Sequence, residues 1–467
     1  MIRFLIHPAT VLALLASAVA VSAQRSPDAT QPVGVAEIDI TPRHPVHLIN
    51  QLTPKESEGW HQRLRAKALA FVNPTLTNAQ VLVVFDGIGV PPQLAREVQR
   101  RMRESPPRGL RANVTICATH DHCAPHLSGL LPDIYGDPLP PAHRARIDQY
   151  THWLTTRIET VARLACAQAR RRQVSWGVGK VRFAVNRRKV ADGKWTGWGN
   201  DPDGRVDHSL PLLCIREPHG AVVATLVSYA CHNTSIGGRD FDNAMSGDWV
   251  GYAQEAIEEA HPGSMALVTL GCGGESRPNA HGGLETARRF GSMIGNEVAR
   301  LLKTELERLG ESPQFRETRV RLPLGPPPGA EELRRIVKAG ASARSRPAKA
   351  RAQIAARLLR TIDRNKSPEL AIPYPIQTWS FGSDFSIVFL SGEVVVDYSH
   401  LLKEKFGAAL WPIAYANDLP GYIPSKRILN EGGYEADQSM AYYGRLQRLL
   451  PSTEYRVLEA VGKLLEN

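Results

Sequence analysis

The chain alternates short runs of hydrophobic, often β-branched residues with longer segments in which hydrophobic residues recur every three or four positions. The short runs predict buried strands, and the longer segments predict amphipathic helices. We expect strands at 80–86, 113–117, 221–229, 266–270 and 385–390, and helices at 91–104, 142–170, 249–260 and 284–306. This alternation indicates an α/β fold with mixed sheets and flanking helices, and we find no internal repeat.

A Pro- and Gly-rich break at 325–329 precedes a strongly basic segment at 330–366. Hydrophobic residues of this segment, among them Leu333, Ile336 and Leu358, have helical spacing. The pattern favours a solvated helical insertion. Because Lys and Arg on one face of an amphipathic helix suit phosphate-bearing surfaces, peripheral contact with an anionic membrane or polymer is the alternative.

The N-terminus has the pattern of a secretory signal peptide. Arg3 precedes an apolar stretch at 12–21, and small residues up to Ala23 offer a cleavage site. The stretch is too short to span a bilayer comfortably. We therefore expect a signal peptide at 1–23, a mature chain from Gln24, and export to the periplasm or the medium.

Composition and charge limit the classes of binding partner that we expect. With 43% hydrophobic and 22% charged residues, the chain of 467 residues is typical of a globular protein. Its net charge of +11, or +10 once Arg3 is removed, favours anionic surroundings. No nucleic-acid-binding signature accompanies that charge, so we expect no nucleic-acid partner. Nothing in the composition fixes the oligomeric state.

Six cysteines, an even number, permit disulfides in an exported protein. We expect buried small residues or disulfide pairs at positions 117, 123, 166, 214, 231 and 272. Since Cys123, Cys231 and Cys272 lie beside polar motifs, a metal-ligand role for them is the alternative.

The run 119–126 places three imidazoles and a carboxylate just after one predicted strand. Neutral imidazole is the commonest protein ligand for zinc. In an extended segment His120 and His122 would point to one side while Asp121 faces away. The run therefore predicts a metal site, with hydrogen-bonded loop histidines as the alternative.

Further polar motifs follow other predicted strands, the position at which open α/β folds place their sites. They are Cys231-His232-Asn233-Thr234-Ser235, the glycine-rich turn 271–279 and Ser391-Gly392-Glu393. A fourth polar motif, 415–422, comes later in the chain. Backbone N–H groups of a glycine-rich turn can approach an anion or a substrate oxygen, although a tight turn without a ligand gives the same pattern.

Taken in order, these motifs resemble those of the neutral, or neutral/alkaline non-lysosomal, ceramidase family. That family has a Thr-His-Thr-His segment, a later His-x-Thr-Ser segment, a Gly-Asp-x-x-Pro segment, a Gly-Glu after a strand, and Gly-Tyr followed by Tyr-Glu. The last pairs here are Gly421-Tyr422 and Tyr434-Glu435. The resemblance covers 33–434 and implies a single catalytic domain over 24–467, with the basic insertion and without the C-terminal β-sandwich domain of longer ceramidases.

Carried over to this sequence, the resemblance implies one zinc ion bound by His120, His232, Glu393 and Tyr422, with a position left for water. Two imidazoles and a carboxylate are a common ligand set for catalytic zinc. Zinc held in this way lowers the pKa of its bound water towards about 7.

The resemblance also implies roles for three further residues. His122 matches a histidine beside the metal and is the candidate general base. Arg187 matches a substrate-contacting arginine and Tyr434 a tyrosine near the scissile carbonyl, so the two would stabilise the oxyanion. For each of these three residues, the alternative is an ordinary polar loop residue or a surface arginine. The neighbouring Arg188 is an alternative to Arg187 as the match to the family's arginine.

The glycine-rich turn departs from the family pattern. Aligned without gaps, Glu275 takes the place of the family's Asp, Pro278 of its Pro, and Arg277 of the serine at its reaction centre. Ser276 comes one residue early, and a shift of one residue reverses side-chain direction. Both Ser276 and Arg277 are candidates for the reaction centre. Arg277 would alternatively bind a substrate anion, which points to a substrate other than ceramide.

The sequence thus predicts an exported zinc-dependent hydrolase that cleaves the amide bond of an N-acylated substrate, either ceramide or a ceramide-like lipid. One alternative is a hydrolase of another N-acyl or ester substrate, such as an acylated amino sugar or amino lipid. The other is a non-catalytic binding protein with the same fold.

Overall fold

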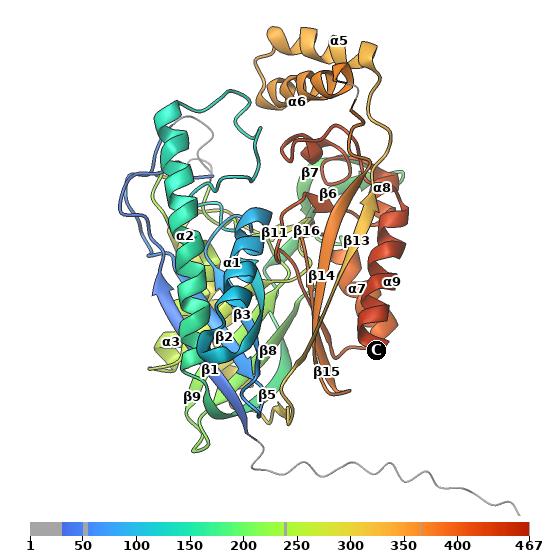
Figure 1. Cartoon of the computed structure of the whole chain (residues 1–467). Coiled ribbons are helices and arrows are strands. Elements are labelled where there is room, and N and C mark those ends of the chain that lie inside the picture. The colour runs from blue at the N-terminus through green and yellow to red at the C-terminus, as the bar shows by residue number, and fades with distance from the viewer. Residues whose placement is uncertain (1–29, 50–54, 238–240, 365, 467) are drawn as a thin grey trace, which may run out of the picture.

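The computed structural model describes residues 30–49, 55–237, 241–364 and 366–466. The predicted signal peptide at 1–23 lies outside the described residues. Within them the chain forms four layers: helices, a large sheet, a smaller sheet and a second set of helices (Figure 1). The α/β fold with mixed sheets and flanking helices is therefore confirmed.

The large sheet has nine strands. In spatial order they are β10 (Met265–Leu270), β9 (Val222–Tyr229), β8 (Ser209–Arg216), β5 (Arg170–Lys180), β1 (Gln31–Asp39), β2 (Arg65–Val72), β3 (Asn78–Phe85) and β4 (Arg111–Ala118), with β12 (Glu307–Arg308) beside β5. Two neighbouring pairs, β3–β4 and β9–β10, are parallel. The end strand β10 comes close to β2, because Nζ of Lys67 on β2 donates to the carbonyl of Ala266 on β10 at 3.0 Å.

The smaller sheet packs face to face on the large one. Its strands are β13 (Gln314–Pro323), β14 (Ala371–Phe381), β15 (Phe385–Leu390) and β17 (Leu410–Ile413), in that order. Trp379 of β14 meets Phe71 of β2 edge to face, with ring centroids 5.9 Å apart. Aromatic and branched side chains from both sheets form the core between them, which removes a large apolar area from water.

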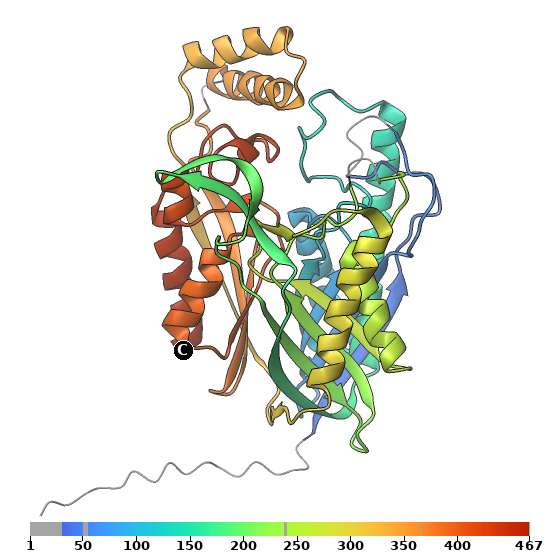
Figure 2. The same cartoon turned by 180° about the vertical axis from the view of Figure 1, so that it is seen from behind.

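Helices cover the outer faces of both sheets (Figures 1 and 2). The large sheet carries α1 (Pro92–Glu104), α2 (Pro141–Ala167), α3 (Asp248–Ala260) and α4 (Gly283–Leu301). The smaller sheet carries α7 (Val396–Phe406) and α9 (Ser452–Glu466), and α8 (Lys426–Glu431) lies next to α9. The remaining helical elements of the described chain are η1 (Pro107–Gly109) and η3 (Gln438–Ala441).

Two short sheets stand near the end of the molecule at which the parallel strands finish. One consists of β11 (Ser276–Pro278), β6 (Ala184–Ala191) and β7 (Lys194–Asp201) in that order, and the other of β16 (Glu393–Val394) and β18 (Tyr422–Ile423). Strands β4, β9, β10 and β15 all point their carboxyl ends to this region, so the polar motifs that follow them come together.

Each predicted strand and helix is present, with ends shifted by a few residues. The largest shift is in the predicted helix 284–306, which ends as α4 at Leu301 because the chain then turns towards β12. The basic segment 330–366 forms two helices, α5 (Ala330–Ala341) and α6 (Arg346–Asp363), which lie against each other at the top of Figure 1.

Two further sequence-based expectations concern membranes and cysteines. Among the described helices, none is both long enough and apolar enough to cross a membrane. All six cysteines are buried and no disulfide joins any two of them, so the interpretation as small buried residues is confirmed and disulfide pairing is wrong. No cysteine joins the group of potential metal ligands found in the described part of the chain.

Candidate active site

His120 lies two residues after β4 and adopts a left-handed backbone conformation, with φ of 49°. Such strain in a non-glycine residue is typical of functional positions. Its Nδ1 donates to the carbonyl of Ile88 at 2.7 Å, and the ring of Tyr415 stacks on the imidazole with centroids 4.4 Å apart. The expected extended segment is therefore wrong at His120, because the backbone turns there. The ring is held rigidly by its neighbours.

His232 follows β9 and is held by the glycine-rich turn. Its backbone N–H donates to the carbonyl of Ser276 and its Nδ1 to the carbonyl of Gly273, both at 3.0 Å. A Cβ at position 273 would lie 2.6 Å from the carbonyl carbon of Ala230. The turn thus needs glycine to approach the end of β9, and this close approach orients His232.

Glu393 begins β16, and Tyr422 pairs with it in the parallel β16–β18 ladder. The phenol of Tyr443 donates a hydrogen bond to Oε1 of Glu393. Oε2 has no hydrogen-bond donor in the described part of the chain and faces Nε2 of both His120 and His232, at 3.2 and 3.1 Å. A buried carboxylate oxygen therefore faces two imidazole nitrogens.

This arrangement fits a metal ion. Because Nδ1 of His120 and Nδ1 of His232 each donate to a carbonyl, Nε2 is the nitrogen of each ring that is left to bind a metal. Burial lowers the pKa of His232 to about 4, so its ring is neutral at pH 7. The two nitrogens and an oxygen of Glu393 lie within 4.8 Å of one another, and all three residues are buried. These three atoms face one another with lone pairs. A divalent cation bound between them would accept a lone pair from each.

His122 and Tyr422 border this triad. Nε2 of His122 is 3.3 Å from Nε2 of His120, and the Tyr422 hydroxyl is 3.3 Å from Nε2 of His232. Burial, together with the nearby His120, lowers the pKa of His122 well below its ordinary value, so this ring is neutral and able to accept a proton. The third histidine of the run, His126, points elsewhere and donates from Nε2 to the carbonyl of Leu130.

Arg187 of β6 lies directly behind Tyr422. Its guanidinium donates to the Tyr422 hydroxyl at 2.9 Å and to the carbonyl of Gly274 at 2.8 Å, and it pairs with Glu435 at 3.0 Å. The guanidinium carbon stands 4.6 Å from the ring centroid of Trp198 and 5.8 Å from that of Tyr434. Burial raises the pKa of Tyr422 well above its ordinary value, and the positive charge of Arg187 beside it acts against that rise.

Tyr434 is partly buried in an aromatic wall beside Tyr422. Its ring centroid is 5.5 Å from that of Tyr422 and 4.7 Å from that of Trp198 on β7. Burial, reinforced by the negative charge of Glu393, raises the pKa of Tyr434, so its phenol keeps its proton and remains a hydrogen-bond donor. Arg188, the alternative to Arg187, is fully buried and pairs with Glu431 and Glu435.

Ser276 and Arg277 take different positions, as expected for successive residues of a strand. The side chain of Ser276 is fully buried, and its hydroxyl has no hydrogen-bond partner among the described residues. Arg277 is partly exposed and donates from Nε and Nη2 to the amide oxygen of Asn200, at 3.0 and 2.8 Å. The structure thus brings Ser276 next to His232 through its backbone, whereas the Arg277 side chain lies on the β7 side.

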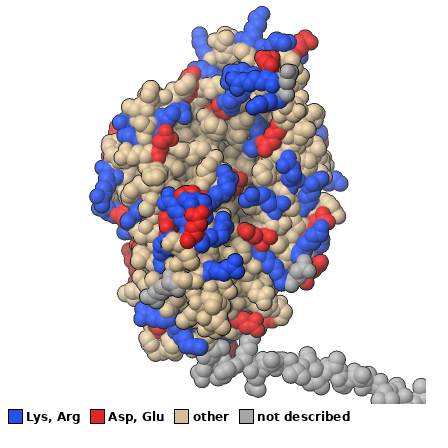
Figure 3. All heavy atoms as spheres, viewed as in Figure 1, with Lys and Arg blue, Asp and Glu red and all other residues tan. Residues whose placement is uncertain are grey.

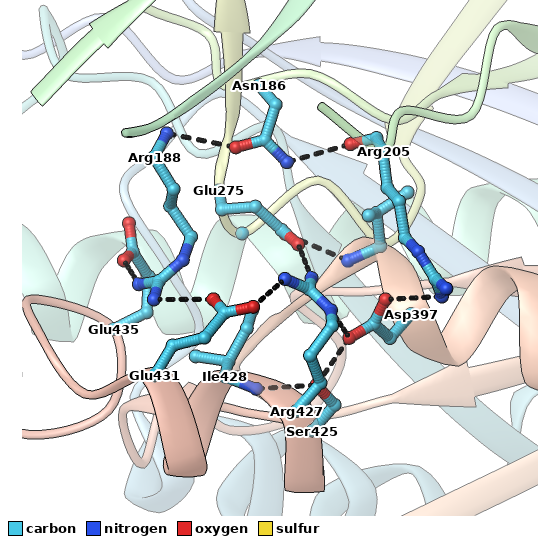
Figure 4. A network of polar contacts seen from close by, with 12 residues as sticks. Asn186, Arg188, Arg205, Glu275, Asp397, Ser425, Arg427, Ile428, Glu431 and Glu435 are labelled. Carbon is cyan, nitrogen blue, oxygen red and sulfur yellow. Dashed lines mark hydrogen bonds and ion pairs between the residues drawn. The ribbon is translucent and has the colours of Figure 1, made fainter. Parts of the chain in front are cut away.

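A polar network that includes Glu275 of the glycine-rich turn joins several buried carboxylates and arginines (Figure 4). Glu275 accepts a hydrogen bond from the backbone N–H of Val396 at 2.8 Å, and Arg427 bridges Asp397 and Glu431. Burial, with a smaller contribution from Asp397, raises the pKa of Glu275 to about 8. Arg427 lies 3.8 Å from Glu275 but is shared with the other two carboxylates, so it does not offset this burial.

Sequence reasoning missed three contributors to the site. Tyr443 contacts Glu393 from a segment without a periodic signal, and Tyr415, which stacks on His120, was noted only as the first residue of the motif 415–422. Glu435 was noted only as part of a motif, and its pairing with two arginines is a tertiary contact. A tyrosine-rich stretch at 434–443 is the one local signal that could have pointed to this wall.

Comparisons with known proteins concern the fold. No family model and no curated protein matches this sequence. Among solved structures, neutral ceramidase from Pseudomonas aeruginosa matches with a TM-score of 0.64 and 16% identity, over 92% of this chain and 73% of that one. A ceramidase complexed with C2 matches with a TM-score of 0.65 and 16% identity, over 92% of this chain and 74% of that one. The chain therefore shares the fold of these neutral ceramidase structures over nearly its whole length, and the resemblance that its motifs indicated is confirmed.

Proposed function

We propose that this protein is an exported, zinc-dependent hydrolase that cleaves the amide bond of an N-acylated substrate. The observation that carries the proposal is the convergence of Nε2 of His120, Nε2 of His232 and Oε2 of Glu393 in a buried site. Nitrogen and carboxylate ligands of this kind suit zinc. The two solved structures described above are ceramidases, which supports ceramide or a ceramide-like lipid as the substrate class.

In this proposal His120, His232, Glu393 and Tyr422 hold the metal. A zinc ion at these residues would polarise the amide carbonyl and lower the pKa of a bound water. Burial raises the pKa of the Tyr422 hydroxyl well above its ordinary value, and the hydrogen bond and charge of Arg187 oppose that rise, which supports Tyr422 as the fourth ligand. Tyr443 and the carbonyls of Ile88 and Gly273 fix the orientation of the ligand side chains.

His122 is our candidate for the general base. Its ring is neutral because burial lowers its pKa, and its Nε2 lies beside His120 at the edge of the triad. A neutral imidazole there accepts the proton of the attacking water and later returns it to the leaving amine. Its lowered pKa makes it a weak base but leaves it unprotonated at neutral pH.

Tyr434 and Arg187 are our candidates for stabilising the tetrahedral oxyanion. The Tyr434 phenol is protonated and lies beside Tyr422, and Arg187 supplies a fixed positive charge that Glu435 holds in place. Preorganised donors of this kind lower the barrier because they need no reorientation as charge develops. The backbone carbonyl of Ser276 accepts a hydrogen bond from the His232 N–H, and its side chain is fully buried, so we assign Ser276 to the turn and give it no reacting role.

The experiment that tests the function is a substrate panel assayed with and without metal. Purified protein is measured by elemental analysis, then assayed on ceramide, other N-acyl amides, an acylated amino sugar and a matched ester, before and after chelation. We expect about one zinc per chain and hydrolysis of at least one N-acyl amide that chelation abolishes and zinc restores. Full activity of metal-free protein would refute the mechanism. Bound zinc without any turnover would favour the non-catalytic binding protein.

We also propose that the basic hairpin α5–α6 contacts anionic lipid. It is anchored to the 126–139 loop, since Arg357 pairs with Asp133 and Lys349 with Asp137. Basic side chains gather over this hairpin at the top of Figure 3. Three of them on α5, Arg334, Arg335 and Lys338, are exposed and take part in none of the ion pairs found in the described chain. An anionic membrane surface attracts such residues.

A further inference from the structure

Arg277 is a cation fixed in place by a neutral partner. Its Nε and Nη2 both donate to the amide oxygen of Asn200, and the Asn200 amide nitrogen in turn donates to the carbonyl of Asn279 at 3.0 Å. Within the described ranges, no carboxylate pairs with Arg277. An arginine oriented by an amide keeps its full charge and its remaining N–H donors, so it can bind an anion.

The position of Arg277 places it beside the proposed oxyanion groups. On the antiparallel β11–β6 ladder Arg277 pairs with Val185, and Arg187 is two residues further along β6. Residues in such a diagonal relation have side chains about 7–8 Å apart. Consistent with this proximity, burial and the positive charge of Arg187 both lower the pKa of Arg277. Two guanidinium groups therefore share one edge of the site.

The carboxylates near Arg277 already form ion pairs with other arginines. Glu435 pairs with both Arg187 and Arg188, and Glu431 pairs with Arg188 and Arg427 (Figure 4). No spare negative charge thus faces Arg277 from the part of the network that the structure describes. A partly buried cation next to a second cation is stabilised when an anion from outside the chain pairs with it.

The guanidinium group of Arg277 indicates which kind of group would bind it. Its planar array of N–H donors matches the oxygens of a carboxylate, a sulfonate or a phosphate. A neutral amide or hydroxyl would also accept a hydrogen bond, but it would leave the charge of Arg277 uncompensated. An anionic group therefore gains more than a neutral one of the same size.

We propose that Arg277, oriented by Asn200, selects substrates that carry an anionic group near the scissile amide. This inference rests on the proposed function, since it names the substrate class of the same site: N-acyl amides with a carboxylate, sulfonate or phosphate on the amine portion. Arg277 acts as a specificity-determining residue, and the bond cleaved remains the amide.

The test compares matched acyl amides on the zinc-loaded protein. N-octanoyl glycine, N-octanoyl taurine and N-octanoyl phosphoethanolamine provide the three anions, and N-octanoyl ethanolamine is the neutral reference. We expect kcat/KM for at least one anionic substrate to exceed that of the reference by about tenfold or more, the effect of one hydrogen bond to a charged group. Equal values for all four would overturn the inference while leaving the proposed function intact.

Variants assign the preference to this side chain. In Arg277→Gln the ratio of anionic to neutral kcat/KM should fall towards one, mainly through KM, and Arg277→Lys should restore part of it because it keeps the charge without the planar donors. A parallel fall on all substrates would contradict a role in specificity.

A binding measurement separates this inference from the proposed function. Calorimetry with N-octanoyl taurine and N-octanoyl ethanolamine is run on the wild-type protein and on Arg277→Gln. Tighter binding of the anion that the variant loses supports the inference even if no amide is hydrolysed. Equal binding of both compounds by the wild-type protein overturns it whether or not the protein is an amidase.

Discussion

Tyr443 donates a hydrogen bond to Oε1 of Glu393, which leaves Oε2 of the same carboxylate facing Nε2 of His120 and His232. The contact fixes one oxygen so that the other has a defined direction. A residue that never touches the proposed metal would thereby decide how well Glu393 binds it.

The first prediction concerns this contact. Tyr443→Phe removes the donor and keeps the ring, so we expect metal affinity to fall about 10- to 100-fold with little change in folding. Competition with a chelator of known affinity, alongside circular dichroism, measures both. Tyr455→Phe on the exposed face of α9 is the matched control. Unchanged affinity in Tyr443→Phe would show that Glu393 does not depend on its partner.

The second prediction separates His120 from His122. His120→Ala should lose both zinc and activity, because it removes a ligand of the buried triad. His122→Ala should keep zinc and lose activity by about 10²- to 10⁴-fold, as expected for a general base. Metal content and single-turnover rates are measured on both, with His219→Ala at an exposed position as control. Loss of zinc in His122→Ala would make His122 a ligand instead.

The third prediction is a dependence of stability on pH. Burial and the nearby Asp397 raise the pKa of Glu275 to about 8, above its unfolded value of 4.5. The folded state therefore holds a proton that the unfolded state releases, so the stability from Glu275 is present below pH 4.5 and is lost as pH rises to about 8.

Glu275→Gln should remove this dependence. Relative to the variant, the wild-type free energy of unfolding should fall by up to about 1.4 kcal/mol per pH unit within that window. Urea unfolding from pH 5 to pH 8 measures the difference. Parallel curves for the two proteins would mean that Glu275 is ionised in the folded state, paired with Arg427 across 3.8 Å.

The fourth prediction tests the basic hairpin. Replacing Arg334, Arg335 and Lys338 with Glu should weaken binding to vesicles that contain anionic lipid, since each basic residue near such a surface contributes about 1 kcal/mol. Flotation or calorimetry at low and high salt measures binding. A matched triple replacement of Arg288, Arg289 and Lys303, exposed on or just after α4, controls for net charge. An equal loss of vesicle binding in both variants would show that net charge, and not the hairpin, determines the binding.

The sequence by itself determined which segments are strands and which residues carry chemistry. Hydrophobic runs such as 385–390 indicate buried strands, because a strand covered on both faces has no side chain that faces water. His120, His232 and Glu393 stand out for the same reason, since each is a polar residue placed immediately after such a run. The hydrophobic pattern was enough to predict the fold class, and the resemblance of the ordered motifs to the neutral ceramidase family was needed to propose His120, His232 and Glu393 as metal ligands.

The tertiary structure alone decided which ends meet and which groups support them. The left-handed turn at His120, the hydrogen bond from Tyr443 to Glu393 and the amide that orients Arg277 join segments far apart in the chain. No local pattern encodes them, because hydrophobic periodicity records only whether a position is buried and not what lies opposite. Packing two sheets face to face brings the strand ends together, and only then do separate polar motifs become one site.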